Sequence, residues 1–201
     1  MANTDAAFGL RPIRRLDGAA WSGNHTTRRM LSSAGALNRG DVVQVLGSGY
    51  VQVSAAGVST HVNLGVFVGC HYLSNALGYP IWSNYWPGSG AVGDVDVFVI
   101  DDPLVIFEVQ SNNAGTPVGF ADIGINADFE VNASTTGFSR WRLNQGTMAV
   151  TGTFPMRVVG LGGSQNTMAG TFPGNGYDHT SGYNIVEVAW NDQFYKQTAG
   201  I

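Results

Sequence analysis

The segment from Asp94 to Gln110 constrains the fold of this chain more than any other part of the sequence. On either side of Asp101-Asp102-Pro103 stands a run of mostly β-branched, aliphatic and aromatic residues. These residue types favour pleated, partly buried strands, whereas proline lacks the N–H group that a strand ladder requires. Runs of this kind indicate strands that are covered on both faces. We therefore expect two central strands that meet in a hairpin or a corner at Pro103.

The rest of the chain has the pattern of further short strands. Glycine accounts for 28 of the 201 residues, about double the usual ~7%, and this suits many tight turns. No stretch of twelve or more residues shows the apolar spacing of a helix. We predict an all-β protein, a β-sandwich or barrel of about eight to ten short strands. Besides the central pair, the candidate strands are 41–46, 49–53, 64–72, 117–123, 128–132, 147–151, 156–161 and 184–190.

Residues 1–35 depart from this pattern. They lack strand-like alternation and contain several chain-breaking dipeptides, so we predict an extended N-terminal arm followed by a single β-rich domain, 36–201. Disordered tails usually lack large apolar residues at intervals, and we expect the arm to dock on its own body or on a neighbour. The apolar residues that would anchor it are Phe8, Leu10, Ile13 and Trp21.

A second departure is an aromatic loop at 74–93. Four aromatic residues fall within eight positions of it, and such side chains bury a large area at a low entropic cost. Three interpretations remain open at this point: a platform that stacks carbohydrate, an anchor at a subunit interface, or a loop folded over its own core. The four residues are Tyr79, Trp82, Tyr85 and Trp86.

Charge is sparse and uneven along the chain. Charged residues make up 12% of the sequence, against ~25% in typical soluble domains. The arm has five arginines and two aspartates, whereas the rest of the chain has five basic and twelve acidic residues. Arginine is enriched and lysine depleted at protein interfaces, and Lys196 is the only lysine. We therefore expect the arm to lie on an acidic protein surface rather than on nucleic acid.

No motif of catalysis, metal binding or cofactor binding stands out. The single cysteine, Cys70, suits a small buried thiol, and the histidines at 25, 61, 71 and 179 lack the spacing of a zinc site. No P-loop or nucleophile elbow occurs. We predict no enzymatic activity, no cofactor and no metal. No apolar segment has the ~20 residues that cross a bilayer, and we expect no membrane partner.

The opening Ala2-Asn3-Thr4-Asp5-Ala6-Ala7-Phe8-Gly9-Leu10-Arg11-Pro12 resembles the start of small structural proteins of tailed bacteriophages, described as head proteins or capsid decoration (cement) proteins. None of the matching blocks is a catalytic fingerprint. The likeness continues at 65–70, 83–86, 101–103, 107–110 and 186–192.

The resemblance implies a β-rich virion protein that binds the outside of an assembled shell and reinforces capsomer junctions. The expected partners are the major capsid protein and further copies of the same chain, with a trimer as the expected oligomer. The protein would be made in the host cytoplasm and reside on the outer capsid surface. The arm would bind capsid carboxylates and apolar pockets through Phe8, Leu10, Arg11, Arg14, Arg15, Trp21, Arg28 and Arg29, while Tyr79, Trp82, Tyr85 and Trp86 would lie at a subunit interface.

Two alternatives belong to other classes. A carbohydrate-binding module that attaches the virion to a host surface would expose Tyr79, Trp82 and Trp86 on a platform. A glycan-cleaving enzyme would need two carboxylates roughly 5–10 Å apart in a cleft, for which Asp94 and Asp102 are the candidates.

Overall fold

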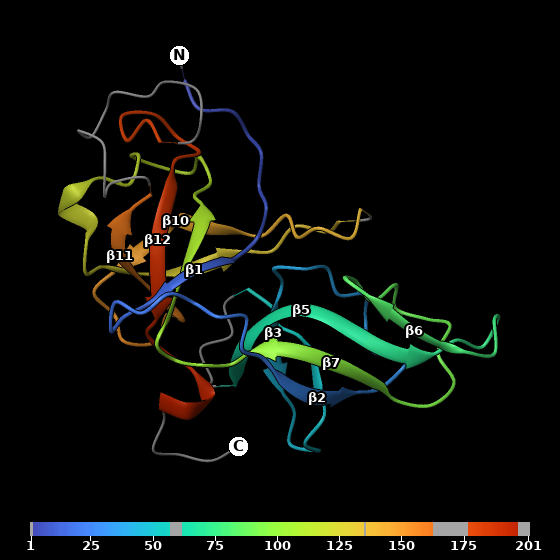
Figure 1. The fold of residues 1–201 in the computed structure, drawn as a ribbon. Coiled ribbons are helices and arrows are strands. Elements are labelled where there is room, and N and C mark those ends of the chain that lie inside the picture. Colours follow the sequence, from blue (N-terminus) through green and yellow to red (C-terminus); the bar gives the residue numbers. More distant parts are fainter. Residues whose placement is uncertain (1, 57–61, 135, 163–176, 197–201) are drawn as a thin grey trace.

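Two antiparallel sheets of six strands each pack against one another as a β-sandwich (Figure 1). The computed structural model describes residues 2–56, 62–134, 136–162 and 177–196. The first sheet has the order β1 (Arg11–Arg15), β8 (Val105–Gln110), β12 (Ile185–Trp190), β11 (Met156–Leu161), β9 (Asn126–Glu130) and β10 (Arg142–Ala149). The second has the order β2 (Thr26–Met30), β7 (Val95–Ile100), β5 (Asn63–Leu73), β3 (Val42–Val45) and β4 (Val51–Val53), and β6 (Pro80–Ser83) pairs with β5.

The segment 94–110 forms a corner between the two sheets. Its first half is β7 in the second sheet, and its second half is β8 in the first sheet. At the bend, the Leu104 N–H donates to Asp102 Oδ1 at 2.9 Å, which satisfies a backbone group that no strand partner reaches. Of the two arrangements that the sequence left open, the structure has the corner, and this segment therefore ties the sheets together.

Two hydrophobic cores lie on either side of this corner. The first is shared by both sheets and includes Ile100 from β7, Phe107 from β8 and Trp190 from β12. The second lies under the second sheet and includes Phe67 from β5 and Trp86 from the aromatic loop. The all-β class and the β-sandwich predicted from the sequence are therefore confirmed.

The N-terminal segment is part of both sheets. Strand β1 pairs with β8 at the edge of the first sheet, and β2 pairs with β7 at the edge of the second. Leu10, which precedes β1, is buried in the first core, and its N–H donates to Gly40 O at 3.0 Å. The boundary expected at residue 35 is therefore not a structural boundary, because residues 11–15 and 26–30 extend along the two halves of the corner.

Other details differ from the sequence prediction. The strand expected at 117–123 is replaced by the short 3-10 helix η1 (Phe120–Asp122), where the Gly119 N–H donates to Asp122 Oδ2 at 2.8 Å. A second 3-10 helix, η2 (Phe194–Lys196), follows β12. Strand β6 was not expected within the aromatic loop. The described residues form twelve strands in all, more than the eight to ten expected, because β1, β2 and β6 were missed.

Nowhere in the described ranges does a helix reach the length and apolarity that crossing a bilayer requires.

Candidate functional site

The outer face of the second sheet has a row of four aromatic rings, which we call the ring ladder: His25, Phe98, Trp82 and His71. The Trp82 and Phe98 rings are nearly parallel, with an interplanar angle of 11° and centroids 5.4 Å apart. His71 packs against Trp82 with centroids 4.4 Å apart, and His25 meets Phe98 edge-on at 5.1 Å. The ladder therefore runs across the sheet: His25 directly precedes β2, Phe98 is on β7, His71 is on β5 and Trp82 is on β6.

Strand register explains why these rings meet. His71 on β5 is paired directly with Trp82 on β6, and Gly69 is paired with Phe98 on β7. Residues two apart on a strand share a face, so all these positions point to the same side. A Cβ atom at Gly69 would lie 3.5 Å from Phe98 Cδ2 and 3.0 Å from Ser83 O. The glycine thus leaves room above β5 for Trp82 and Phe98 to stack.

Charged and polar groups border the ring ladder. Arg29 Nε lies 3.4 Å from Asp96 Oδ1, and His71 Nδ1 lies 3.8 Å from Asp96 Oδ2. Beyond them the Tyr50 hydroxyl donates to Asp94 Oδ2 at 3.1 Å, and this hydrogen bond raises the pKa of Tyr50. The site therefore combines a flat apolar centre with a charged edge, and the Trp82 side chain in it is 70% exposed.

The four aromatic residues predicted at a subunit interface divide into two groups. Tyr79, Trp82 and Tyr85 are exposed. Trp86 has no exposed surface; its ring meets Tyr72 edge-on at 4.9 Å, and its Nε1 donates to Ala34 O at 3.4 Å. The interpretation of Trp86 as an interface or platform residue is therefore wrong, because it fills the second core of its own chain.

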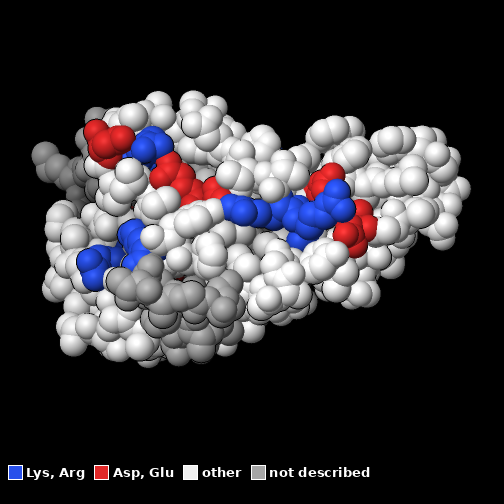
Figure 2. Space-filling model, turned by 90° about the horizontal axis from the view of Figure 1, so that it is seen from below, with Lys and Arg blue, Asp and Glu red and all other residues white. Residues whose placement is uncertain are grey.

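The arginines predicted to bind capsid carboxylates pair instead with carboxylates of their own chain. Figure 2 shows basic and acidic side chains side by side in a line across one face of the molecule. Several pairs follow strand register, since Arg11 is the partner of Glu108 and Arg29 is the partner of Asp96. The basic character of residues 1–35 is thus matched by acidic residues on β7, β8 and β12 and at the corner between β7 and β8. The pairs are Arg11–Glu108 at 2.5 Å, Arg14–Glu187 at 2.6 Å, Arg28–Asp101 at 2.8 Å, Arg29–Asp96 at 3.4 Å, and Arg15 with Asp102.

The apolar residues of the same segment also contact their own chain. Leu10 is buried in the first core and Trp21 packs against it. Phe8 is half-buried beneath Arg11, whose Cζ lies 4.8 Å from the centre of the phenyl ring. Docking of the segment is therefore intramolecular, and Leu10 is not accessible to a capsid pocket.

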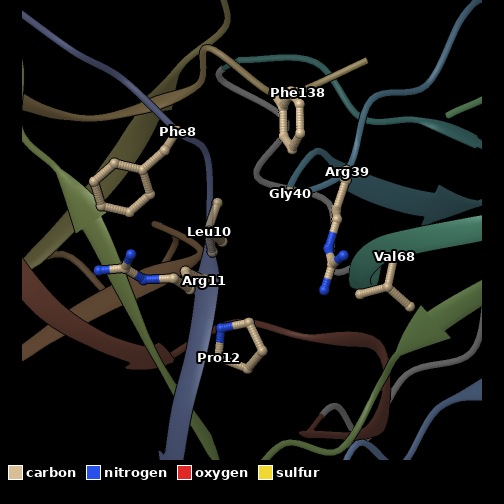
Figure 3. Close-up of a pocket in the computed structure, with 8 residues that line it drawn as sticks. All are labelled: Phe8, Leu10, Arg11, Pro12, Arg39, Gly40, Val68 and Phe138. Carbon is tan, nitrogen blue, oxygen red and sulfur yellow. The ribbon is translucent and has the colours of Figure 1, made fainter. Parts of the chain in front are cut away.

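A hollow of about 290 Å³, which we call the seam pocket, lies where β1 of the first sheet approaches β5 of the second (Figure 3). Arg39 extends into it. Its guanidinium forms no hydrogen bond or ion pair with any residue that the structure describes. Sequence reasoning missed this pocket because its walls come from segments far apart in the chain and match no motif. The lining residues are Phe8, Leu10, Arg11, Pro12, Arg39, Gly40, Val68 and Phe138.

The acidic pair considered for glycan cleavage is separated by a whole strand. Asp94 precedes the six-residue β7 and Asp102 follows it, so at about 3.3 Å per residue they lie roughly 20 Å apart or more. That distance exceeds the roughly 5–10 Å that a glycosidase pair requires. Asp94 and Asp102 therefore cannot act on one glycosidic bond.

Potential metal ligands are likewise dispersed. Across the described ranges, no three His, Cys, Asp or Glu side chains come together in a way that could hold a metal ion. His61 lies outside the described residues. Cys70 is buried, and burial raises the pKa of its thiol to about 12, which disfavours the nucleophilic thiolate.

Fold and surface together define an all-β, two-sheet protein with an exposed aromatic face and a pocket at the seam between its sheets. Comparison of the chain with protein-family models, with curated proteins and with solved structures gave no significant match.

Proposed function

We propose that the protein is a virion structural protein of a tailed bacteriophage, a capsid decoration or cement protein that binds the outer shell and stabilises capsomer junctions. The structural observation behind the proposal is the ring ladder, in which Trp82 is held on Phe98 and His71 while 70% of its surface stays exposed. The resemblance of the blocks at 2–12, 65–70, 83–86, 101–103, 107–110 and 186–192 to phage head proteins supplies the class of shell.

The ring ladder has the properties of a protein-binding centre. Tryptophan and tyrosine dominate the energetically important positions of interfaces, and a ring that is already fixed loses little conformational entropy on binding. Trp82 has this support from below, and Tyr79 and Tyr85 add exposed aromatic surface on the same loop. The charged edge formed by Arg29 and Asp96 offers polar contacts at the rim, as interfaces usually have.

Binding of this kind strengthens a shell by mass action. A protein that binds the assembled shell and not its free subunits stabilises assembly by RT ln(1 + [L]/Kd), which is about 2.7 kcal/mol per site when its concentration is 100 times Kd. Self-association of the protein, with a trimer as the expected order, would multiply the contacts at one junction. The major capsid protein and further copies of this chain are therefore the proposed partners.

Reconstitution tests the proposal directly. Shells that lack this protein are mixed with the purified chain, separated from free protein by sedimentation and imaged by electron cryomicroscopy. We expect ordered density on the outer surface and higher resistance of the shell to heat. Trp82→Ala should weaken binding at least tenfold, whereas Val150→Ala, at an exposed apolar position outside the ladder, should not. Absence of density at saturating protein would refute the proposal.

Carbohydrate binding is the second candidate, because Trp82 presents a flat ring beside Asp96 and Arg29. The apolar face of a sugar ring can pack on the Trp82 indole, while the Asp96 carboxylate and the Arg29 guanidinium beside it can form hydrogen bonds with the sugar hydroxyls. Trp86 would take no part. A glycan array followed by calorimetry with wild type and Trp82→Ala distinguishes the candidates: saturable glycan binding that is lost in the variant supports this function, and no binding across the array excludes it.

A further inference from the structure

The seam pocket places a positive charge among apolar walls. Figure 3 shows the Arg39 guanidinium in the hollow between Pro12 and Val68, with Phe138 at the rim. Most arginines of the chain pair with carboxylates, but Arg39 has no such partner among the described residues. At about 290 Å³ the pocket lies near the lower end of ligand pockets, which span roughly 300–1,000 Å³. It therefore suits one large apolar side chain with an anionic group beside it.

A second feature on the same chain has that chemistry. The turn 120–123, which we call the Phe120 knob, presents Phe120 at 68% exposure and Ile123 at 41%. Between them lies Asp122, whose Oδ2 accepts the Gly119 N–H at 2.8 Å and so fixes the turn. Its carboxylate forms no ion pair with a basic side chain anywhere in the described part of the chain. The knob is thus an exposed aromatic side chain with an unneutralised carboxylate beside it.

We propose that the Phe120 knob of one copy inserts into the seam pocket of a second copy, with Asp122 pairing with Arg39. Charge complementarity supports this match: a cation and an anion that have no ion-pair partner among the described residues meet, each next to exposed apolar surface. The knob lies beside β11 in the first sheet, and the pocket lies between β1 and β5. One chain therefore presents both halves of the contact, on different surfaces.

Other exposed apolar residues fit the pocket less well. Val150 is 87% exposed, but no acidic residue lies within five positions of it in the sequence. Trp82 is stacked on Phe98 within the ring ladder, and the nearby carboxylate of Asp96 already contacts Arg29. Among these three candidates, only the Phe120 knob offers both an aromatic side chain and a carboxylate without a basic partner.

A contact between two different surfaces is heterologous, and it closes into a ring when the rotation between copies allows it. The inference rests on the self-association in the proposed function and names its contact. It is tested on the isolated chain with no shell present. Failure here would therefore leave shell binding to be decided by reconstitution, and failure of shell binding would leave this contact standing.

The first test exchanges the charges of Arg39 and Asp122 in the full chain. Self-association of each variant is measured by sedimentation velocity over a concentration series. Wild type should associate, and Phe120→Ala, Arg39→Glu and Asp122→Arg should each weaken association at least tenfold. The double variant Arg39→Glu/Asp122→Arg should regain most of it, because the pair is restored with its signs exchanged. Arg140→Glu and Val150→Ala, exposed positions outside knob and pocket, should behave as wild type. The inference would be overturned if the wild type were monomeric, or if the single-substitution variants associated as strongly as the wild type.

Disulfide trapping is the second test, and it leaves Phe120, Asp122 and Arg39 in place. Chains with Ile123→Cys, at the exposed end of the knob, and chains with Phe138→Cys are mixed and oxidised. We expect cross-linked dimers in the mixture and far fewer with either variant alone, since Phe138 lines the pocket. Cys70 gives little background because it is buried and its thiol pKa is about 12. Equal cross-linking in all three samples would contradict the proposed contact, as would cross-linking in none.

Discussion

Trp82 and Phe98 stack with their ring planes 11° apart although their strands are not neighbours in the sheet. Strand β5 lies between β6 and β7, and the two rings meet above Gly69. An exposed indole in solution would rotate among several conformers. Here Phe98 and His71 support it from below, so the ring is already positioned before any partner arrives.

Truncation of two tryptophans in the same loop should destabilise the fold by very different amounts. Trp86→Ala empties a fully buried site in the second core and should cost about 3–5 kcal/mol of unfolding free energy. Trp82→Ala removes a ring that is mostly exposed and should cost less than about 1 kcal/mol. Urea unfolding followed by circular dichroism gives both values. Similar losses at the two positions would mean that Trp82 is part of the core.

The N-terminal segment offers a matched pair of leucines. Leu10 is buried in the first core, whereas Leu16, just past the end of β1, is exposed. Leu10→Ala should lower the unfolding free energy by about 2–5 kcal/mol, and Leu16→Ala should stay within about 0.5 kcal/mol of wild type. Thermal and urea unfolding of the isolated chain measure both. A neutral Leu10→Ala would restore the idea of an arm that is reserved for a neighbouring protein.

Ion pairs along the edge strands should differ in strength according to burial. Glu187 is 6% exposed and Arg14 contacts it at 2.6 Å, so Arg14→Met leaves a buried carboxylate without its partner and should cost about 3 kcal/mol. Arg29 is 68% exposed and lies 3.4 Å from Asp96. Arg29→Met should therefore cost less than about 1 kcal/mol. Unfolding measurements in low salt and in 1 M salt provide the check, and an equal cost for both variants would contradict it.

A strand of this fold can be predicted from the sequence when its own residues favour a strand, and not when it depends on a partner far away in the chain. Runs such as 156–161 consist of residues with strong strand preference, and β11 has the bounds that they predict. Strand β1 gives no such signal, because its residues are arginines, Ile13 and Pro12. It is a strand only because β8 offers an edge with acidic partners, and that information lies about 90 residues away. The charge pattern was visible, but the sequence could not show that its partners belong to the same chain.

The site was predictable to a similar extent. Trp82 could be picked out as one of four clustered aromatic residues, but the sequence could not separate it from Trp86. The separation follows from the pairing of β6 with β5, which places Trp82 on the outer face beside His71 and turns Trp86 inward. Arg39 gave no signal at all, because the sequence cannot show that no carboxylate within the described part of the structure lies next to its guanidinium.

The buried thiol makes a sensitive probe of unfolding. Burial raises the pKa of Cys70 to about 12, so at pH 8 only about one thiol in ten thousand would be ionised even if it were reached. We expect native protein to react with Ellman's reagent at least about a thousandfold more slowly than protein in denaturant. Fast stoichiometric labelling of the native chain would show that the second core opens readily.

Asp41 should make the stability of the protein, measured relative to its amide variant, rise as the pH falls. The carboxylate is buried in the turn before β3, where its Oδ2 accepts the Asn38 N–H at 2.7 Å. Burial raises the pKa of Asp41 above its ordinary value of 3.8. The folded state therefore binds the proton more tightly than the unfolded state does. This contribution to stability is fully present below the unfolded pKa and is lost as the pH rises through the folded pKa.

The variant Asp41→Asn isolates this effect, because its amide oxygen can still accept the Asn38 N–H and it carries no titratable proton. The unfolding free energy of wild type minus that of the variant should rise on acidification from neutral pH towards the unfolded pKa. Its slope should not exceed about 1.4 kcal/mol per pH unit. At pH 7 the variant should be at least as stable as wild type, since it avoids burying a charge. Urea unfolding at half-unit steps from pH 3.5 to 7 measures the difference, in which the other carboxylates cancel. A difference that stays constant, or that falls on acidification, would mean that Asp41 is held as a favourable anion by its hydrogen bonds rather than penalised by burial.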